Sequence, residues 1–222
     1  MLVNADFTRR AVVPADQARW IASPQAGVER AMLDRVGGEQ ARATSLVRYA
    51  RASHFPSHPH PGGEEILVLA GVFSEGERHY PAGWYLRNPP GSAHRPSSDD
   101  GALLFVKLRQ MRADETRTVR IDTRDPAAWR QRGERAFCPL FDSPEETVAL
   151  QRLAAQAAPE IAGEGRVELL VIEGALRLDD HSYPRGSWIR LPDGDRPACR
   201  AQTAGTTVYV KTLRERRDEV TA

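Results

Sequence analysis

The sequence is short of the features that mark membrane-bound, nucleic-acid-binding and disulfide-stabilised proteins. Its 31 lysines and arginines balance 30 acidic residues, so the formal net charge is only +1. No excess of charge of one sign attracts the chain to nucleic acid or to an acidic membrane. The two cysteines, Cys138 and Cys199, are not in a CxxC arrangement, and we expect two small buried thiols in a reducing compartment. These absences predict a cytoplasmic protein that binds neither nucleic acid nor membranes.

Long apolar and helical segments are also scarce. The longest apolar run, ILVLAGVF, is far too short to cross a bilayer, and the first residues carry no apolar segment of the secretory kind. Helical patterning is limited to one turn predicted within residues 30–40 and a short helix that begins at Pro126 after an Asp125 N-cap. The charged residues 214–220 are expected to form a solvated tail. The sequence therefore leaves little room for helices.

Short β-rich segments separated by turn residues dominate the chain after residue 40. The 17 glycines and 16 prolines fit many turns. The predicted strands read SLVRY, EILVLAGVF, WYLR and LLFVKL in the first half, and VELLVIEGALRL, SWIRL and TTVYVKTL in the second. This pattern predicts an all-β protein.

The chain contains an internal repeat with a spacing of 103 residues. When residues 65–94 are aligned with residues 168–197 without a gap, ten of the thirty positions are identical. The identical pairs are Glu65/Glu168, Leu67/Leu170, Val68/Val171, Gly71/Gly174, Tyr80/Tyr183, Pro81/Pro184, Gly83/Gly186, Arg87/Arg190, Pro89/Pro192 and Gly91/Gly194. The only lysines, Lys107 and Lys211, align with one further residue of offset. The repeat predicts two β domains, 1–113 and 114–222.

Four residues of the first copy that suit metal binding are all replaced in the second copy. The replacements are His58 by Ile161, His60 by Gly163, Glu64 by Val167 and His94 by Pro197. Positions kept in both copies are expected to serve the fold, with glycine where the backbone needs a positive φ or a close approach. The neighbouring Glu65 is kept as Glu168, so we assign it a structural role. The coordinated loss predicts that the four replaced residues act together in the first domain.

The spacing of these residues suits a metal site. Residues i and i+2 of a strand share a face, so His58 and His60 point the same way, and Glu64 has the same parity. Three imidazoles and one carboxylate suit a borderline divalent ion, namely zinc, iron(II), manganese, nickel or copper. We predict a metal site formed by His58, His60, Glu64 and His94.

The remaining histidines are expected to have other roles. We predict that His54, His79 and His181 are not ligands. His54 is a candidate partner for a ligand, because it too is lost in the second copy, where Ala157 stands.

Conspicuous aromatic and basic residues have simple interpretations. Aromatic packing inside a barrel is expected for Phe73, Trp84 and Tyr85. Arg87 recurs as Arg190, which favours an ion pair over a ligand-binding role. A charged substrate would need a basic side chain in the barrel lumen, and Arg48 and Arg95 are the candidates.

The repeated segments resemble the two motifs of the cupin family. The matching patterns are His58-x-His60-x3-Glu64-x6-Gly71 and Gly83-x5-Pro89-x-Gly91-x2-His94. The second copy keeps the glycine and proline positions without the ligands, so it resembles a cupin scaffold that lacks the metal. The resemblance implies a double-stranded β-helix, the cupin jelly-roll barrel, in two tandem domains with few short helices. Domain 1–113 would bind the metal, and domain 114–222 would be degenerate and metal-free.

More narrowly, HPHPGGEEILVLAGVF followed by RNPPGSAH resembles the cupin-like domain of the ChrR-type anti-sigma factors. The resemblance implies a zinc ion held by His58, His60, Glu64 and His94, and a part in the response to singlet oxygen and organic peroxides. In that family an N-terminal zinc-binding helical module holds a sigma factor, and no HxxxCxxC segment of that kind occurs before residue 40 here. The resemblance therefore implies a regulatory protein partner. The missing module puts a sigma factor in doubt as that partner.

Two functions from different classes remain open on this basis. The first is a zinc-binding regulatory sensor of oxidative stress. The second is a cupin dioxygenase with iron(II), manganese or nickel, acting on a small organic molecule in the first barrel. The ligand set is the same for both, so the sequence leaves open whether the protein is an enzyme. Cupins often pair through sheet edges, and we expect a homodimer.

Overall fold

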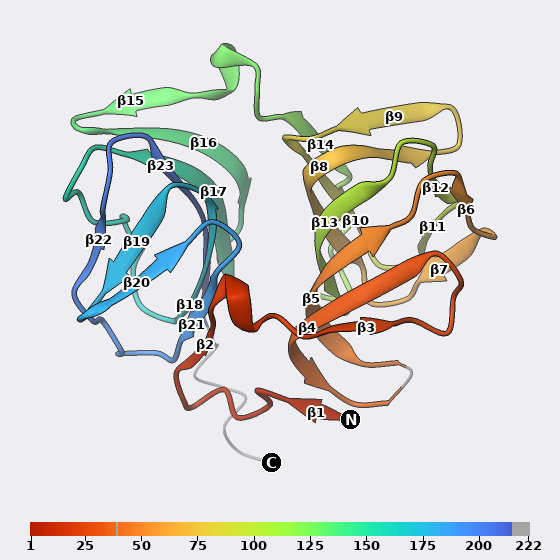
Figure 1. Ribbon diagram of the computed structural model, residues 1–222, viewed down its shortest axis with the longest axis horizontal. Helices are drawn as coiled ribbons and strands as arrows, with labels where there is room; N and C mark the ends of the chain where they lie inside the picture. The colour runs from red at the N-terminus through yellow and green to blue at the C-terminus, as the bar shows by residue number, and fades with distance from the viewer. Residues whose placement is uncertain (39, 215–222) are drawn as a thin grey trace. The chain divides into compact units, whose positions relative to one another are not determined.

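The computed structural model describes residues 1–38 and 40–214, and within them the chain is all-β. Apart from strands it has two single 3-10 turns, η1 (Ala15–Gln17) and η2 (Pro126–Ala128) (Figure 1). Neither turn is long and apolar enough to cross a membrane, and no other helix occurs in this part of the chain. The predicted fold class is confirmed. The predicted charged tail lies almost wholly outside the described residues.

The contacts divide the chain into two units, each with its own apolar core. The first consists of residues 1–5 and 18–124, and the second of residues 6–17 and 125–222, of which 215–222 are not described. The sequence predicted the division at residues 113 and 114. Beyond that point, β14 (Val119–Asp122) pairs with a strand of the first unit, β10 (Trp84–Asn88).

The first unit is built on one large antiparallel sheet and a small two-stranded one. The main path of the large sheet runs β1-β4-β5-β13-β8-β10-β14, and β11 pairs with β7 in the small sheet. Its strands not yet given are β1 (Leu2–Val3), β3 (Trp20–Ala22), β4 (Val28–Val36), β5 (Arg42–Tyr49), β6 (Ser53–His54), β7 (His58–His60), β8 (Glu64–Glu75), β9 (Arg78–Pro81), β11 (Ser92–His94), β12 (Pro96–Ser98) and β13 (Ala102–Leu108).

The second unit repeats the central part of this arrangement. Its larger sheet runs β15-β16-β17-β23-β18-β21-β2, and a three-stranded sheet runs β20-β19-β22. Its strands are β2 (Ala11–Val13), β15 (Arg130–Arg132), β16 (Arg135–Asp142), β17 (Glu146–Leu153), β18 (Arg166–Glu173), β19 (Ala175–Leu178), β20 (His181–Pro184), β21 (Trp188–Leu191), β22 (Cys199–Ala201) and β23 (Thr206–Leu213). The order β4-β5-β13-β8-β10 corresponds to β16-β17-β23-β18-β21, so the repeat seen in the sequence is a repeat of topology.

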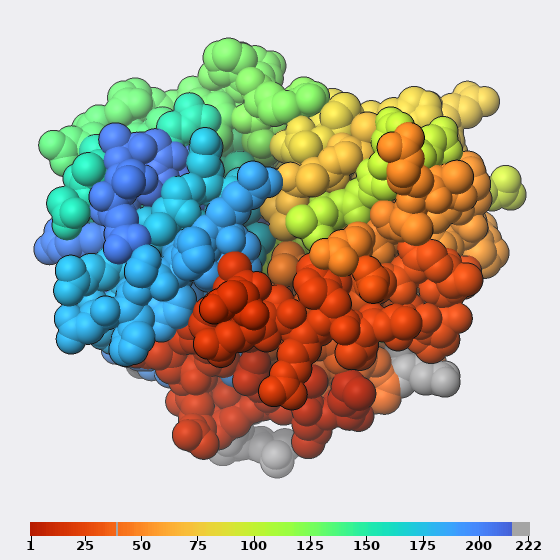
Figure 2. All heavy atoms as spheres, viewed as in Figure 1, coloured from red at the N-terminus to blue at the C-terminus, as the bar shows by residue number. Residues whose placement is uncertain are grey.

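The N-terminal strand β2 is the edge strand of the second unit. It pairs with β21, and Ala11 lies opposite Arg190. Figure 2 shows residues of the N-terminal segment, in dark red, against residues coloured blue. The ring of Phe7 lies under the guanidinium groups of Arg166 and Arg190, 4.7 and 4.2 Å from its centre. The N-terminal residues thus complete a barrel whose other strands lie more than 100 residues later.

Charged residues shared by the two copies have the structural role expected of them. Glu65 lies opposite both Arg87 and Lys107 on the neighbouring strands, and all three side chains are buried. The Arg87 guanidinium donates to the Glu65 carboxylate at 3.2 Å. In the second unit Glu168 lies opposite Arg190 and Lys211 in the same register. The ion pair predicted for Arg87 is confirmed, and so is the alignment of the two lysines.

A glycine shared by the two copies, Gly71 and Gly174, lies where the backbone closely approaches a neighbouring segment. Gly71 has φ +69°, and a Cβ there would overlap the carbonyl oxygen of Gly101. Gly174 has φ +72°, and a Cβ there would meet Thr206 Oγ1 at 2.6 Å. Only glycine accepts both the left-handed φ and the contact, which explains its presence in both copies.

Residues 30–40 do not form the predicted helical turn, because most of them belong to β4. Buried Ala31 and Leu33 alternate there with partly exposed Arg30 and Met32. This period of two is typical of a strand, and charged neighbours hide it in the sequence. The short helix predicted at Pro126 is present as η2, and the Asp125 carboxylate caps it by accepting from the Ala127 amide at 2.8 Å.

Predictions about single core residues are mostly confirmed. Phe73 and Tyr85 are fully buried, and Trp84 packs against the first core. Both cysteines are free; Cys138 is buried, whereas Cys199 is only partly buried.

Candidate metal centre

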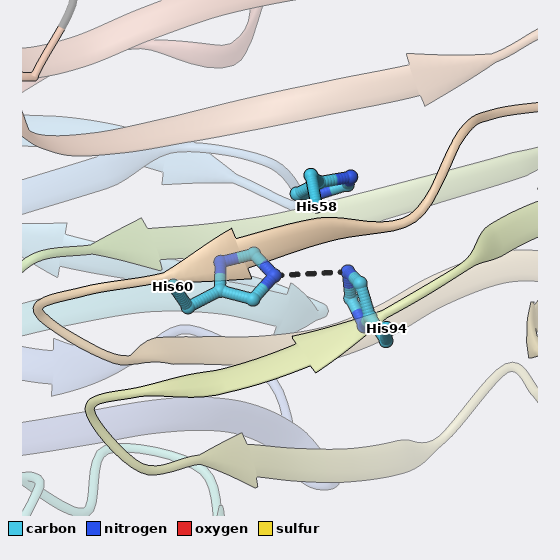
Figure 3. A group of neighbouring side chains, drawn as sticks. All are labelled: His58, His60 and His94. Carbon is cyan, nitrogen blue, oxygen red and sulfur yellow. Dashed lines mark hydrogen bonds between the residues drawn. The ribbon is translucent and has the colours of Figure 1, made fainter.

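Two short strands bring three histidines together at one end of the first barrel. β7 and β11 pair antiparallel, with His58 opposite His94 and Ser92 opposite His60. One ring nitrogen of each histidine lies within 4.8 Å of the others, and His60 Nε2 is 3.0 Å from His94 Nε2. Figure 3 shows His60 and His94 facing each other from the two strands. These three histidines are the only group of three or more potential metal ligands found in residues 1–38 and 40–214.

The outward hydrogen bonds of His58 and His94 leave a lone pair on the ring nitrogen that faces the group. His94 Nδ1 lies 2.7 Å from a carboxylate oxygen of Glu75, and His58 Nδ1 lies 3.2 Å from the carbonyl oxygen of Pro56. Both oxygens are acceptors, so each Nδ1 carries the proton and each Nε2 keeps its lone pair. Ligating histidines in proteins usually show this outward hydrogen bond. The donor set therefore fits a divalent metal.

Glu64 lies beside the histidines, as the sequence predicted, and Glu65 points to the other face of β8. Glu64 Oε2 is 3.4 Å from His60 Nε2 and 3.6 Å from His94 Nε2. The carboxylate is buried and accepts a hydrogen bond from the Asn88 side chain at 3.3 Å. Glu64 is thus in place to act as a fourth ligand.

A polar network behind the histidines escaped the sequence analysis. Asn88 Nδ2 donates to both Glu64 and Glu75, and Arg120 Nη2 donates to Glu75 at 2.8 Å and to Asn88 at 2.6 Å. The signal that revealed the ligands was also present here, because Leu178 and Leu191 stand at the positions of Glu75 and Asn88 in the second copy. For Arg120 the repeat gives no signal, because it enters from β14, after the aligned segment.

Burial and the neighbouring rings favour the neutral form of His58 and His60. Burial lowers the pKa of His60 to about 3, and the neighbouring His94 and His58 add to the effect. Burial also lowers the pKa of His58. A neutral imidazole is the form that binds a metal, so protons compete weakly at these positions.

The two carboxyl groups respond in opposite directions. Burial raises the pKa of Glu64 to about 7 in spite of the nearby His94. Burial acts in the same direction on Glu75, but hydrogen bonds from His94 and Arg120 outweigh it and lower the pKa to about 2. Glu75 is therefore an ionised partner for the His94 ring at neutral pH.

The other histidines lie away from this group. His54 is exposed beside Asp99, with 3.4 Å between Nε2 and a carboxylate oxygen, so the structure gives it no contact with a ligand. His79 is hydrogen bonded to the Ser74 hydroxyl at 2.8 Å, and the His181 ring lies 6.4 Å from that of Tyr183.

A cavity of about 420 Å³ opens beside the candidate centre. Its wall includes His58, His60 and Glu64, together with Arg30 of β4. The two arginines that the sequence offered for the lumen do not line it: Arg48 forms an outward ion pair with Glu29 at 2.9 Å, and Arg95 is exposed.

In the second unit apolar residues stand at three of the positions of the candidate centre and its network. A cavity of about 190 Å³ is lined there by Ile161, Pro197 and Leu191, which replace His58, His94 and Asn88. The second copy has therefore replaced both the candidate ligands and the Asn88 that supports them.

The paired barrels, the repeated strand order and the three-histidine group define a protein of the cupin class. Residues 8–112 match the family model of the ChrR Cupin-like domain. No curated protein matches the sequence.

Solved structures of the cupin fold resemble nearly the whole chain. A candidate dioxygenase of Nostoc punctiforme has a TM-score of 0.75 at 14% identity, covering 96% of this chain and 86% of its own. The pirin YhhW of Escherichia coli in complex with nickel(II) has a TM-score of 0.66 at 13% identity, covering 93% and 100%. HEPD of Streptomyces albus, with 2-hydroxyethylphosphonate and Fe(II) bound, has a TM-score of 0.63 at 9% identity, covering 99% and 79%. At these identities the similarity concerns the fold.

Proposed function

We propose that the first barrel binds one divalent metal ion, zinc, through His58, His60, His94 and Glu64, and acts as a regulatory sensor of oxidative stress. The observation that carries the proposal is the convergence of three imidazoles on one point, with Glu64 beside them. Four protein donors fill the tetrahedral shell of zinc, as in structural zinc sites, whereas catalytic sites keep an open position. The match to the ChrR Cupin-like domain supports the regulatory role.

In this proposal the signal is a change at the ligands. Oxidation of a ligand would release the metal and change the side chains that β7 and β11 present to a partner. The proposed partner is a regulatory protein, and the protein itself is proposed to be a cytoplasmic homodimer.

The second candidate is a metal-dependent dioxygenase acting on a small organic substrate. The observation that favours it is the cavity of about 420 Å³ beside the histidines, which is within the usual size range of small-molecule sites. Iron(II), manganese or nickel with six positions would keep two open beside four protein ligands.

One comparison separates the two functions. The zinc-loaded protein is treated with an organic hydroperoxide while a chromophoric chelator reports free zinc. In parallel, the iron(II)-loaded protein is tested for oxygen uptake with small diketones and thiols. Zinc release without oxygen uptake supports the sensor. Oxygen uptake that needs both iron and a diketone or thiol, with no zinc release, contradicts it in favour of the enzyme.

A further inference from the structure

The cavity beside the candidate centre has a cationic side chain in its wall. On β4, Val28 and Arg30 share a face, and the pairing with β5 places them opposite Tyr49 and Val47. Val28, Val47 and Tyr49 also line the cavity, so the alternation of the strands directs Arg30 into the lumen. The wall thus combines apolar side chains with one guanidinium group.

Arg30 is a partly buried arginine without an anionic partner. No hydrogen bond or ion pair joins its side chain to any residue in the described part of the chain. By contrast, Arg48 pairs with Glu29, and Arg120 pairs with Glu75. Burial lowers the pKa of Arg30, which reflects the cost of holding an uncompensated charge there. A bound anion would remove this cost.

The charge around the cavity favours an anion. Arg30, Arg35 and Arg109 line it, whereas Glu64 is the only carboxylate in its wall among the described residues. Glu64 faces His60 and His94, so its charge is directed to the metal ligands. A metal ion would add further positive charge at that end.

The rest of the wall limits the shape and polarity of the ligand. Val47, Ile66, Leu104 and Val106 form the apolar part of the wall. Tyr49 lies among them, and burial raises its pKa, so the hydroxyl stays protonated as a hydrogen-bond donor. A guanidinium group matches the two oxygens of a carboxylate in a forked pair.

From this combination we infer that the first barrel binds a small monocarboxylate with an apolar body, whose carboxylate pairs with Arg30 and whose far end faces His58 and His60. The position of the far end of the ligand rests on the proposed metal centre. The pairing of the carboxylate with Arg30 is independent of that proposal.

The test is binding of benzoate to the full chain, measured by isothermal titration calorimetry, with benzamide as a neutral molecule of the same shape. Benzoate is expected to bind at least tenfold more tightly than benzamide. The Arg30→Gln variant is expected to lose at least tenfold in benzoate affinity. Arg48→Gln is the matched control, because Arg48 is on the neighbouring strand but points outward to Glu29; its affinity should equal that of the wild type.

Equal binding of benzoate and benzamide, no binding of benzoate, or equal effects of the two arginine variants would overturn the inference. If Arg30→Gln does not fold, the ratio of benzoate to benzamide affinity in the wild type decides alone. Repeating the titration with His60→Ala separates this inference from the metal centre. Arg30-dependent benzoate binding that persists in a protein without metal supports the pocket, whether or not the proposed centre exists.

Discussion

At the scale of single residues, Glu75 shows how the candidate centre is held in shape. Its carboxylate accepts from His94 Nδ1 and from Arg120, so it fixes both the tautomer and the direction of the His94 ring. Arg120 and Asn88 in turn hold Glu75 and Glu64. These hydrogen bonds therefore hold the candidate ligands in place.

Replacing Glu75 should weaken metal binding without removing a ligand. We expect Glu75→Gln to lower zinc affinity about 10- to 100-fold, because an amide is a poorer acceptor for the His94 N–H and no longer pairs with the Arg120 charge. Competition with a chromophoric chelator measures the affinity. The control is Glu77→Gln, the same change at an exposed position two residues away. Equal affinities of the two variants would contradict the positioning role.

The two cysteines should be inert in the folded protein. Burial raises the pKa of Cys138 to about 11 and that of Cys199, which also lies near Asp179, to about 12. Both pKa values lie above the ordinary 9.0 of a thiol in the unfolded chain. The buried neutral thiols therefore contribute to the free energy of unfolding in full below pH 9, and this contribution is lost as the pH rises through 11 to 12. At about pH 7.5 we expect slow alkylation by iodoacetamide in the native protein and fast alkylation in urea. Fast native labelling would point to a thiol-based sensor instead of the metal ligands.

At the scale of strands, β8 differs from its counterpart in the second copy. β8 runs without interruption from Glu64 to Glu75 through Gly71, whereas the second copy divides at Gly174 into β18 and β19. The backbone is close-packed at both glycines. The far end of β8 brings Glu75 to the histidines, so the geometry at Gly71 matters for the candidate centre as well as for the sheet.

A Cβ at Gly71 should be far more costly than one at Gly76, although both glycines have positive φ. We expect Gly71→Ala to cost about 3 kcal/mol or more in the free energy of unfolding, because the methyl group would overlap the Gly101 carbonyl. Gly76→Ala, which has no atom within 4 Å of the new Cβ, should cost only about 1 kcal/mol for its left-handed backbone. Urea unfolding monitored by tryptophan fluorescence gives both values. Similar costs would show that the contact with Gly101 is relaxed easily.

The sequence predicted the inner strands β5, β8, β10 and β13 and their counterparts β18, β21 and β23, because alternation and turn residues are local signals. It located the three histidines as a group because their loss in the second copy is visible without a structure. It missed β4, where charged Arg30, Asp34 and Arg35 hide the alternation, and for the same reason it missed the lumen arginine. The hydrogen bonds of Arg120 to Glu75 and Asn88 depend on the pairing of β14 with β10. This pairing joins segments distant in the sequence, and the periodicity of the sequence does not predict it.

At the scale of the whole molecule, the repeat acts as an internal comparison between a barrel with a candidate centre and one without. Both keep the buried Glu–Arg–Lys set across three strands, so that set belongs to the scaffold. Only the first keeps the histidines, Glu64, Glu75 and Asn88. Each barrel also has an extra edge strand beside equivalent strands, β14 on β10 and β2 on β21.

The N-terminal segment should stabilise the second barrel. We expect Phe7→Ala to lower the free energy of unfolding by about 1 to 3 kcal/mol, because Arg166 and Arg190 lose the ring that lies against them. Phe7→Leu, which keeps apolar area but no aromatic face, should recover part of the loss. Urea unfolding measures both, and the metal content of the first barrel should stay unchanged. No loss of stability in Phe7→Ala would contradict a structural role for this segment.

The most direct test of the central claim is the metal content of the protein, by elemental mass spectrometry after purification without a His-tag and without air. We expect close to one divalent metal ion per chain in the wild type, and its loss in His60→Ala and His94→Ala. The exposed His54→Ala variant, as control, should keep the metal. A wild-type protein without metal, or variants that retain it, would contradict the assignment of the three-histidine group.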